Sequence, residues 1–91
     1  MQILYFNSFL RLFKELSLQQ QKKINNVISN FISCLEKKTQ IPHGIGLKKL
    51  TKDFWEIRVG LDLRVLFTIE LDTLSFVFVG SHDEIKRYLK I

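Results

Sequence analysis

The sequence has a single cysteine, Cys34, and a single proline, Pro42. One cysteine excludes an internal disulfide, so we expect a reducing compartment in which Cys34 packs as a small apolar side chain. No apolar run approaches the ~18 residues that a membrane-spanning helix needs. The N-terminal stretch MQILYFNSF lacks the basic and apolar segments of a signal peptide. These absences together predict a cytoplasmic protein.

Several motifs that mark common chemistries are also missing. There is no Gly-x-Gly-x-x-Gly, no Walker phosphate loop and no Gly-x-Ser-x-Gly nucleophile turn. Because no cysteine pair and no His-x-x-x-His spacing occurs, the sequence predicts no metal site. We likewise expect no small-molecule cofactor.

What the sequence does contain is typical of one small folded domain that spans residues 1–91. The hydrophobic fraction is 46%, with eight phenylalanines, which favours a packed core. The net charge is +5, and most of the excess lies in residues 1–43, which hold six basic and two acidic residues. Such a charge favours a polyanionic partner, either nucleic acid or an acidic protein, but it is also compatible with a merely soluble basic surface.

The N-terminal half predicts a strand followed by two helices. Residues 2–6 read as a short strand, and Asn7 or Ser8 is expected to cap a first amphipathic helix. Ser17 and Gln20 have the spacing of a capping box and predict the start of a second helix. Its apolar positions recur at helical spacing: Ile24, Val27, Ile28, Phe31, Ile32 and Leu35.

The C-terminal half predicts strands and a last short helix. Residues 37–46 form a loop, residues 47–50 begin a strand or hold an edge, and strands follow at 53–59, 63–70 and 73–80. The last of these is apolar on both faces and should be central. Ser81 and Glu84 have the spacing of a second capping box, and residues 84–90 complete a short terminal helix.

The predicted order is therefore β-α-α-β-β-β-α in an α+β fold. Only the first strand is followed by a connection long enough for parallel pairing. We expect a small twisted, mainly antiparallel sheet with the N-terminal helix hairpin on one face. The other face is partly open, and a short helix ends the chain.

The stretch FWEIRVGLDLR, residues 54–64, holds the strongest candidate for a binding site. Side chains alternate along a strand, so Glu56 and Arg58 lie on one face, and a hairpin turn brings Arg64 near them. Two close arginines require an anion between them. That anion is either a carboxylate, with Glu56 the local candidate, or a phosphate.

Further candidates flank this hairpin. His82 lies in the first turn of the last helix, where unsatisfied N–H groups favour an anion, and it either binds a phosphate or transfers a proton. The alternative is a histidine hydrogen-bonded to the loop. Tyr88 reads as a half-buried anchor of that helix, and Lys48 and Lys49 read as a solvated pair that precedes the hairpin.

The run GLKKL…FWEIRVG..LRVLF.I…LSFVFVGSHDEIKRYL resembles toxins of the RelE/ParE superfamily, and more closely the RelE-type mRNA interferases. The resemblance covers nearly the whole chain and implies the RelE-like fold. It implies the toxin of a type II toxin–antitoxin pair, with a cognate antitoxin, mRNA and the ribosome as partners. Family members cut mRNA without a metal: the ribose 2′-OH attacks the adjacent phosphate and leaves a 2′,3′-cyclic phosphate.

The resemblance also implies residue roles. Arg58 and Arg64 would stabilise the charge of the phosphorane, and His82 would protonate the leaving 5′-oxygen or deprotonate the 2′-OH. Tyr88 would stack on a base or orient the phosphate, and Glu56 would act as general base or orient an arginine. Lys48, Lys49 and Arg58 would bind RNA.

Two positions depart from part of the family. Several ribosome-dependent relatives carry a lysine at the position of Glu56 and an arginine at that of His82, although others carry a histidine there. The acid–base assignment therefore stays open. The alternative function is a ParE-like toxin that inhibits DNA gyrase without nuclease activity, and a third is a degenerate member that binds only its antitoxin and DNA.

Overall fold

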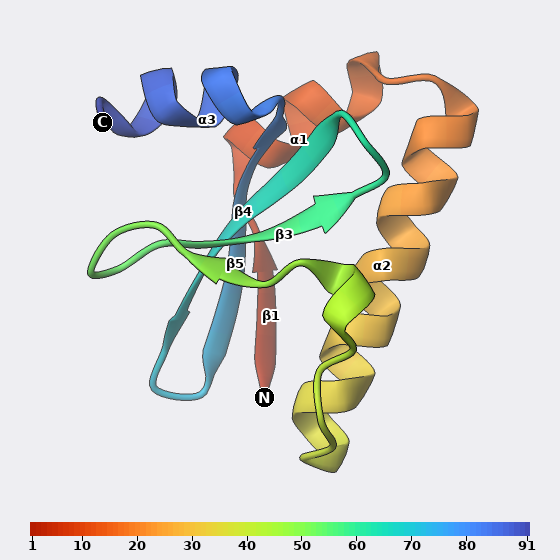
Figure 1. The fold of residues 1–91 in the computed structure, drawn as a ribbon, viewed down its shortest axis with the longest axis vertical. Helices are drawn as coiled ribbons and strands as arrows, with labels where there is room; N and C mark the ends of the chain where they lie inside the picture. The colour runs from red at the N-terminus through yellow and green to blue at the C-terminus, as the bar shows by residue number, and fades with distance from the viewer.

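The computed structural model describes all residues from 1 to 91 and shows one sheet with three helices (Figure 1). The elements in chain order are β1 (Gln2–Tyr5), α1 (Asn7–Glu15), α2 (Leu18–Lys37), the 3-10 turn η1 (His43–Ile45), β2 (Lys48–Lys49), β3 (Trp55–Val59), β4 (Leu63–Glu70), β5 (Thr73–Gly80) and α3 (His82–Leu89). The predicted α+β class and element order are confirmed, and the edge expected at residues 47–50 is the two-residue strand β2.

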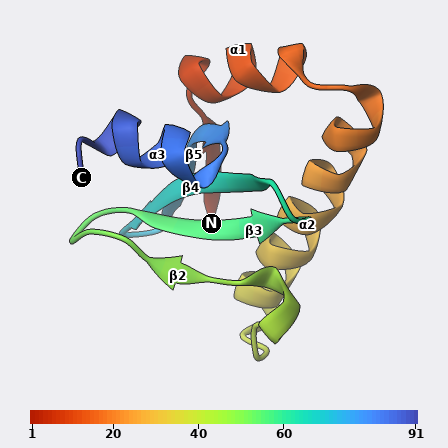
Figure 2. The same cartoon turned by 45° about the horizontal axis from the view of Figure 1, so that its top comes forward.

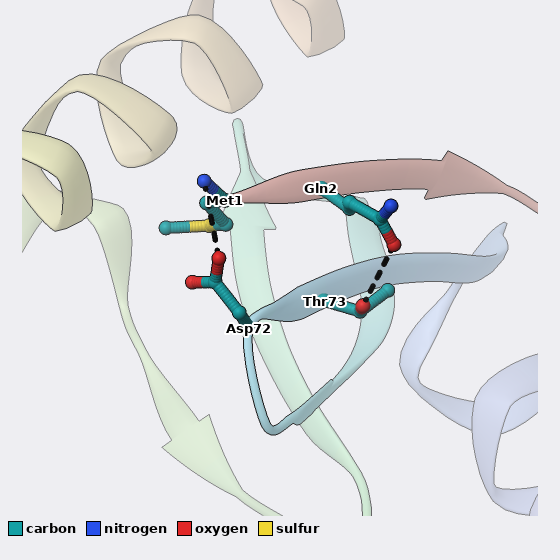
Figure 3. Close-up of polar contacts among 4 residues, drawn as sticks. All are labelled: Met1, Gln2, Asp72 and Thr73. Atoms are coloured by element: carbon teal, nitrogen blue, oxygen red, sulfur yellow. Dashed lines mark hydrogen bonds and ion pairs between the residues drawn. The ribbon is translucent and has the colours of Figure 1, made fainter.

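The strand order is β1-β5-β4-β3-β2, and only β1 and β5 run parallel. Beside this pairing the α-amino group of Met1 lies 3.4 Å from the Asp72 carboxylate, and the Thr73 hydroxyl donates to the Gln2 side chain at 3.3 Å (Figure 3). Since β5 lies between β1 and β4, the prediction that it is a central strand is confirmed.

The two faces of the sheet are covered very differently. Figure 2 shows α1 and α2 around one side of the sheet, where twelve buried residues form the main core. Its aromatic contacts join helix to strand: the ring centroids of Phe31 and Phe67 are 5.0 Å apart, and those of Phe9 and Phe76 are 6.1 Å apart. The opposite face has a small cluster of three buried residues, in which Ile85 of α3 packs on Leu66 and Val77 of the sheet.

The expected cap of α1 is wrong. The N-cap is Phe6, which has no side-chain cap, and Asn7 and Ser8 both lie inside the helix. The chain stays extended through Phe6, whose N–H donates to the Phe76 carbonyl at 2.9 Å. The helix begins at Asn7, which is earlier than a cap at Asn7 or Ser8 would allow. The Ser8 hydroxyl instead donates to the carbonyl of Val77 and ties α1 to β5.

Both predicted capping boxes are present. The Ser17 hydroxyl accepts from the Gln20 N–H, and the Ser81 hydroxyl accepts from the Glu84 N–H, each at 3.1 Å. Glu84 Oε1 in turn accepts from the Ser81 N–H at 2.8 Å. The last helix therefore begins at His82, which confirms the predicted place of His82 in its first turn.

A β-bulge bends the sheet near α3. Leu66 pairs with Phe78 and Phe67 pairs with Phe76, so Val77 is an extra residue in β5. A bulge of this kind bends its strand and increases the local twist. None of the helices has the length and apolar character that crossing a membrane requires.

The capping carboxylate of Glu84 predicts a pH-dependent stability. The hydrogen bond from the Ser81 backbone N–H is the main reason why the pKa of Glu84 lies below its ordinary value of 4.5. The Ser81 side chain and the positive charge of Arg87 lower the pKa further. Because the folded-state pKa is depressed, the stabilisation is present above pH 4.5 and is lost as the pH falls through the lowered value. We expect Glu84→Gln to lower the free energy of unfolding at pH 7 by under about 1 kcal/mol, since the group is exposed.

Urea unfolding of wild type and variant at pH 7, and at steps below pH 4.5, measures this difference. Asp83→Asn is the matched control, because Asp83 lies in the same first turn without a capping hydrogen bond. A difference for Glu84→Gln that persists unchanged in acid would contradict the assignment.

Candidate functional site

Two arginines lie side by side on the sheet face that α3 only partly covers. Arg58 of β3 is directly opposite Arg64 of β4, and Arg64 is directly opposite Gly80 of β5. Directly opposed residues point to the same face of a sheet. Glu56 shares this face with Arg58, two residues away, and is opposite Leu66. The structure thus brings together the three hairpin residues that the sequence singled out.

Arg64 is held by a buried carboxylate. Its Nη1 donates to Glu56 Oε1 at 2.8 Å. The Glu56 side chain is only 1% exposed, and its second oxygen, Oε2, has no hydrogen-bond partner. A substrate cannot contact this carboxylate while the surrounding side chains stay in place. Of the two roles left open for Glu56, general base and orienting residue, the geometry favours the second.

Arg58 has no such partner. It is exposed and forms no ion pair, and its side chain lies along the backbone at Gly46. A Cβ at Gly46 would lie 3.0 Å from Arg58 Cβ and 3.2 Å from its Nε. Gly46 also has a φ of +63°, so it is needed for both space and conformation. The Arg58 guanidinium is therefore positioned at the sheet surface with its donors free for an anion.

A basic groove lies on the same sheet face as the arginines, although neither Arg58 nor Arg64 lines it. It has a volume of about 260 Å³ and lies between β2 and α3, with β3 and β4 running between those two elements in Figure 2. Its lining residues are Lys48, Lys49, Leu50, His82, Ile85, Lys86 and Ile91. Lysines and a histidine line it without any acidic side chain, so the groove favours an anionic ligand.

The two predicted RNA-binding lysines face different surroundings. Lys48 is opposite Glu56 in the β2–β3 pairing, so it shares the face of the arginines. Lys49 is opposite Trp55, and its Nζ lies 5.5 Å from the centre of the Trp55 ring. Trp55 packs against the main core on the other face. Both lysines line the groove, but only Lys48 shares the sheet face of the arginines.

Lys86 is a site residue that was not predicted from the sequence. It lines the groove together with His82, one helical turn earlier on α3. Residues four apart on a helix share a face, and this spacing was the available signal. Lys86 adds a third lysine to the lining of the groove, on the same helix as His82.

Tyr88 is not part of the groove. Its ring packs at a tilt against Phe78 of β5, with centroids 4.5 Å apart, and it does not line the groove that contains His82. Six residues along a helix correspond to about 120° around its axis, so the two side chains lie on different flanks of α3. The structure thus places Tyr88 as a half-exposed anchor of α3 and does not bring it together with His82.

A larger hollow lies elsewhere on the sheet. It measures about 400 Å³ near the turn before β3 and the end of β4. Its lining includes the carboxylates of Asp53 and Glu70, which makes it a poor site for an anion. No group of three His, Cys, Asp or Glu side chains converges to hold a metal ion.

No protein-family model and no curated protein matches the sequence. Solved structures do match it over nearly the whole chain. The RelB–RelE antitoxin–toxin complex from Methanococcus jannaschii aligns with a TM-score of 0.71 at 22% identity, and the match covers 93% of this chain and 96% of that one. YafQ from Escherichia coli aligns with a TM-score of 0.68 at 20% identity, covering 91% and 94%.

A YoeB/ParE toxin from Agrobacterium tumefaciens aligns equally well, with a TM-score of 0.68 at 17% identity, covering 90% of this chain and 99% of that one. Each of these proteins shares the sheet and helix arrangement at low sequence identity. The chain therefore has the fold of the RelE/ParE superfamily of toxins.

Proposed function

We propose that the protein is the toxin of a type II toxin–antitoxin pair and that it cuts mRNA, bound to the ribosome, without a metal. The observation that carries the proposal is the set of cations on one sheet face. Arg58 lies there with free donors next to Arg64, and the adjacent groove holds His82, Lys48 and Lys86. A similar structure is a RelE toxin in complex with RelB, which supports an antitoxin as the protein partner here.

The proposed reaction uses this face as follows. The scissile phosphodiester lies over Arg58 and the outer edge of Arg64, which stabilise the charge that develops on the phosphorane. The 2′-OH attacks the phosphorus and loses its proton to a water molecule, the bond to the 5′-oxygen breaks, and His82 protonates that leaving oxygen. The products are a 2′,3′-cyclic phosphate and a 5′-OH. Lys48 and Lys86 bind flanking phosphates, while Lys49 contributes charge to the groove.

Glu56 and Tyr88 have supporting roles in this proposal. Glu56 fixes the guanidinium of Arg64 through one oxygen and remains enclosed. Tyr88 anchors α3 through its contact with Phe78, and α3 carries His82. Both residues act through a neighbour and not by touching the phosphate.

A first prediction compares the two histidines. We expect His82→Gln to reduce mRNA cleavage by at least about 100-fold, because it removes the general acid. His43→Gln is the matched control and should leave cleavage unchanged, since His43 lies in η1 and outside the groove. The measurement is mapping of mRNA 5′ ends after induction. If wild type produces no new ends but causes gyrase-dependent DNA breaks, the gyrase-inhibitor alternative replaces the proposal.

A second prediction separates the two arginines. Arg64→Ala leaves the buried Glu56 carboxylate without its partner, so it should lower the free energy of unfolding by about 3 kcal/mol. Arg58→Ala removes no ion pair and should change stability by under about 0.5 kcal/mol. Both should abolish cleavage.

The double variant Glu56→Gln/Arg64→Ala is the control for the unpaired charge. It should recover most of the stability that Arg64→Ala loses, but none of the cleavage, as judged by urea unfolding and cleavage assays on the same preparations. Full cleavage by stably folded Arg58→Ala would remove Arg58 from the site.

A third prediction concerns the exposed basic residues of α2. We propose that Lys22 and Lys23 receive an acidic antitoxin segment or contact ribosomal RNA. Reversing both charges to glutamate should weaken binding to at least one of these partners about tenfold and flatten its salt dependence. Charge reversal of Lys37 and Lys38, at the far end of α2, is the comparison. Binding of both partners that ignores salt and the Lys22/Lys23 reversal contradicts this surface.

A further inference from the structure

Gly80, the last residue of β5, is a glycine for reasons of space. Its φ is not positive, so its backbone conformation is open to any residue. A Cβ built at this position, however, would lie 3.0 Å from Glu84 Oε1 and 3.1 Å from Phe78 Cε2. Both distances are shorter than most contacts that a Cβ atom makes in proteins, so a side chain here would have to push its neighbours away.

Glu84 approaches Gly80 with two atoms: Oε1, which a hydrogen bond holds, and Cβ, which is attached to the helix backbone and would lie 3.2 Å from the new Cβ. Glu84 Oε1 is the same atom that accepts the Ser81 N–H at 2.8 Å and closes the capping box of α3. The carboxylate therefore lies between the end of β5 and the first turn of α3. His82 lies within that turn, between Ser81 and Glu84. The position of the imidazole thus depends on how closely the carboxylate approaches Gly80.

The second close atom links Gly80 to the far end of α3. The ring of Phe78 packs against the ring of Tyr88, with centroids 4.5 Å apart. Both the first turn and the last turn of α3 are therefore supported by the strip formed by Phe78 and Gly80. That strip also borders the arginines, because Gly80 is directly opposite Arg64.

We propose that Gly80 is a positioning residue: its missing side chain sets the distance between His82 on α3 and the paired arginines on the sheet. Its effect on cleavage rests on the proposed function, whereas its effect on the place of α3 does not. A methyl group at residue 80 forces Glu84 and Phe78 outward by a few tenths of an ångström. Misplacement of a catalytic group on this scale lowers turnover much more than binding.

Gly80→Ala tests the proposal, with Gly44→Ala as matched control. Gly44 also has no positive φ, and a Cβ there would meet nothing within 4 Å. NMR spectra of both proteins report the Tyr88 ring and the His82 imidazole, of which the Tyr88 ring is eight residues from the substitution and packs against Phe78. We expect both signals to shift in Gly80→Ala and to stay in place in Gly44→Ala. Unmoved signals in Gly80→Ala would overturn the proposal, whether or not wild type cleaves RNA.

Cleavage kinetics test the functional half on the same two proteins. Gly80→Ala should lower kcat about tenfold or more with little change in KM, and Gly44→Ala should change neither. Equal kcat in Gly80→Ala and wild type would overturn the proposal. A wild type that shows no cleavage instead contradicts the proposed function and leaves the NMR result to decide the place of α3.

The variant Glu84→Ala in the Gly80→Ala background controls for poor folding. It removes the carboxylate that the new methyl group would meet, although it also removes the cap. Because the two residues are in contact, their effects should not add. We expect the double variant to be at least as stable as Gly80→Ala alone, with the His82 signals closer to wild type. Strictly additive losses of stability would overturn the contact between Gly80 and Glu84 as the cause.

Discussion

The ion pair between Glu56 and Arg64 is the constraint on which the partly open sheet face depends. A carboxylate with 1% exposure loses its hydration and is tolerated only with a close partner, here the guanidinium 2.8 Å away. One of its oxygens still has no partner. Apolar replacements of buried ion pairs are often neutral or stabilising. The pair is therefore poorly explained by stability, and it is well explained by the fixed orientation that it gives Arg64 beside Arg58.

The two faces of the sheet divide stability from chemistry. The main core lies between the sheet and α1 and α2, whereas only three buried residues form the contact between the sheet and α3. A thin cluster leaves room on the same face for side chains that water can reach, including Arg58 and His82. The groove between β2 and α3 exists because neither element extends far across the sheet. Regions with few apolar contacts are where functional groups are commonly found.

Sequence reasoning succeeded where the cause was local or followed from strand register. The capping boxes at Ser17 and Ser81 depend on residues three apart, and both are present. The proximity of Arg58 and Arg64 followed from one hairpin. The cap of α1 was wrong because the hydroxyl of Ser8 has a partner 69 residues away, the Val77 carbonyl. A contact at that separation leaves no local pattern.

The sequence by itself determined the class, the order of elements and the residues that carry positive charge, because periodicity and capping act over a few residues. The tertiary structure decided between the alternatives that the sequence left open. It paired Arg64 with Glu56, left Arg58 free, joined His82 to Lys48 and Lys86 across a groove, and turned Tyr88 away onto Phe78. The physical reason is that α3 reaches the sheet at an angle and height set by long-range packing. Spacing along the chain carries no information on either quantity.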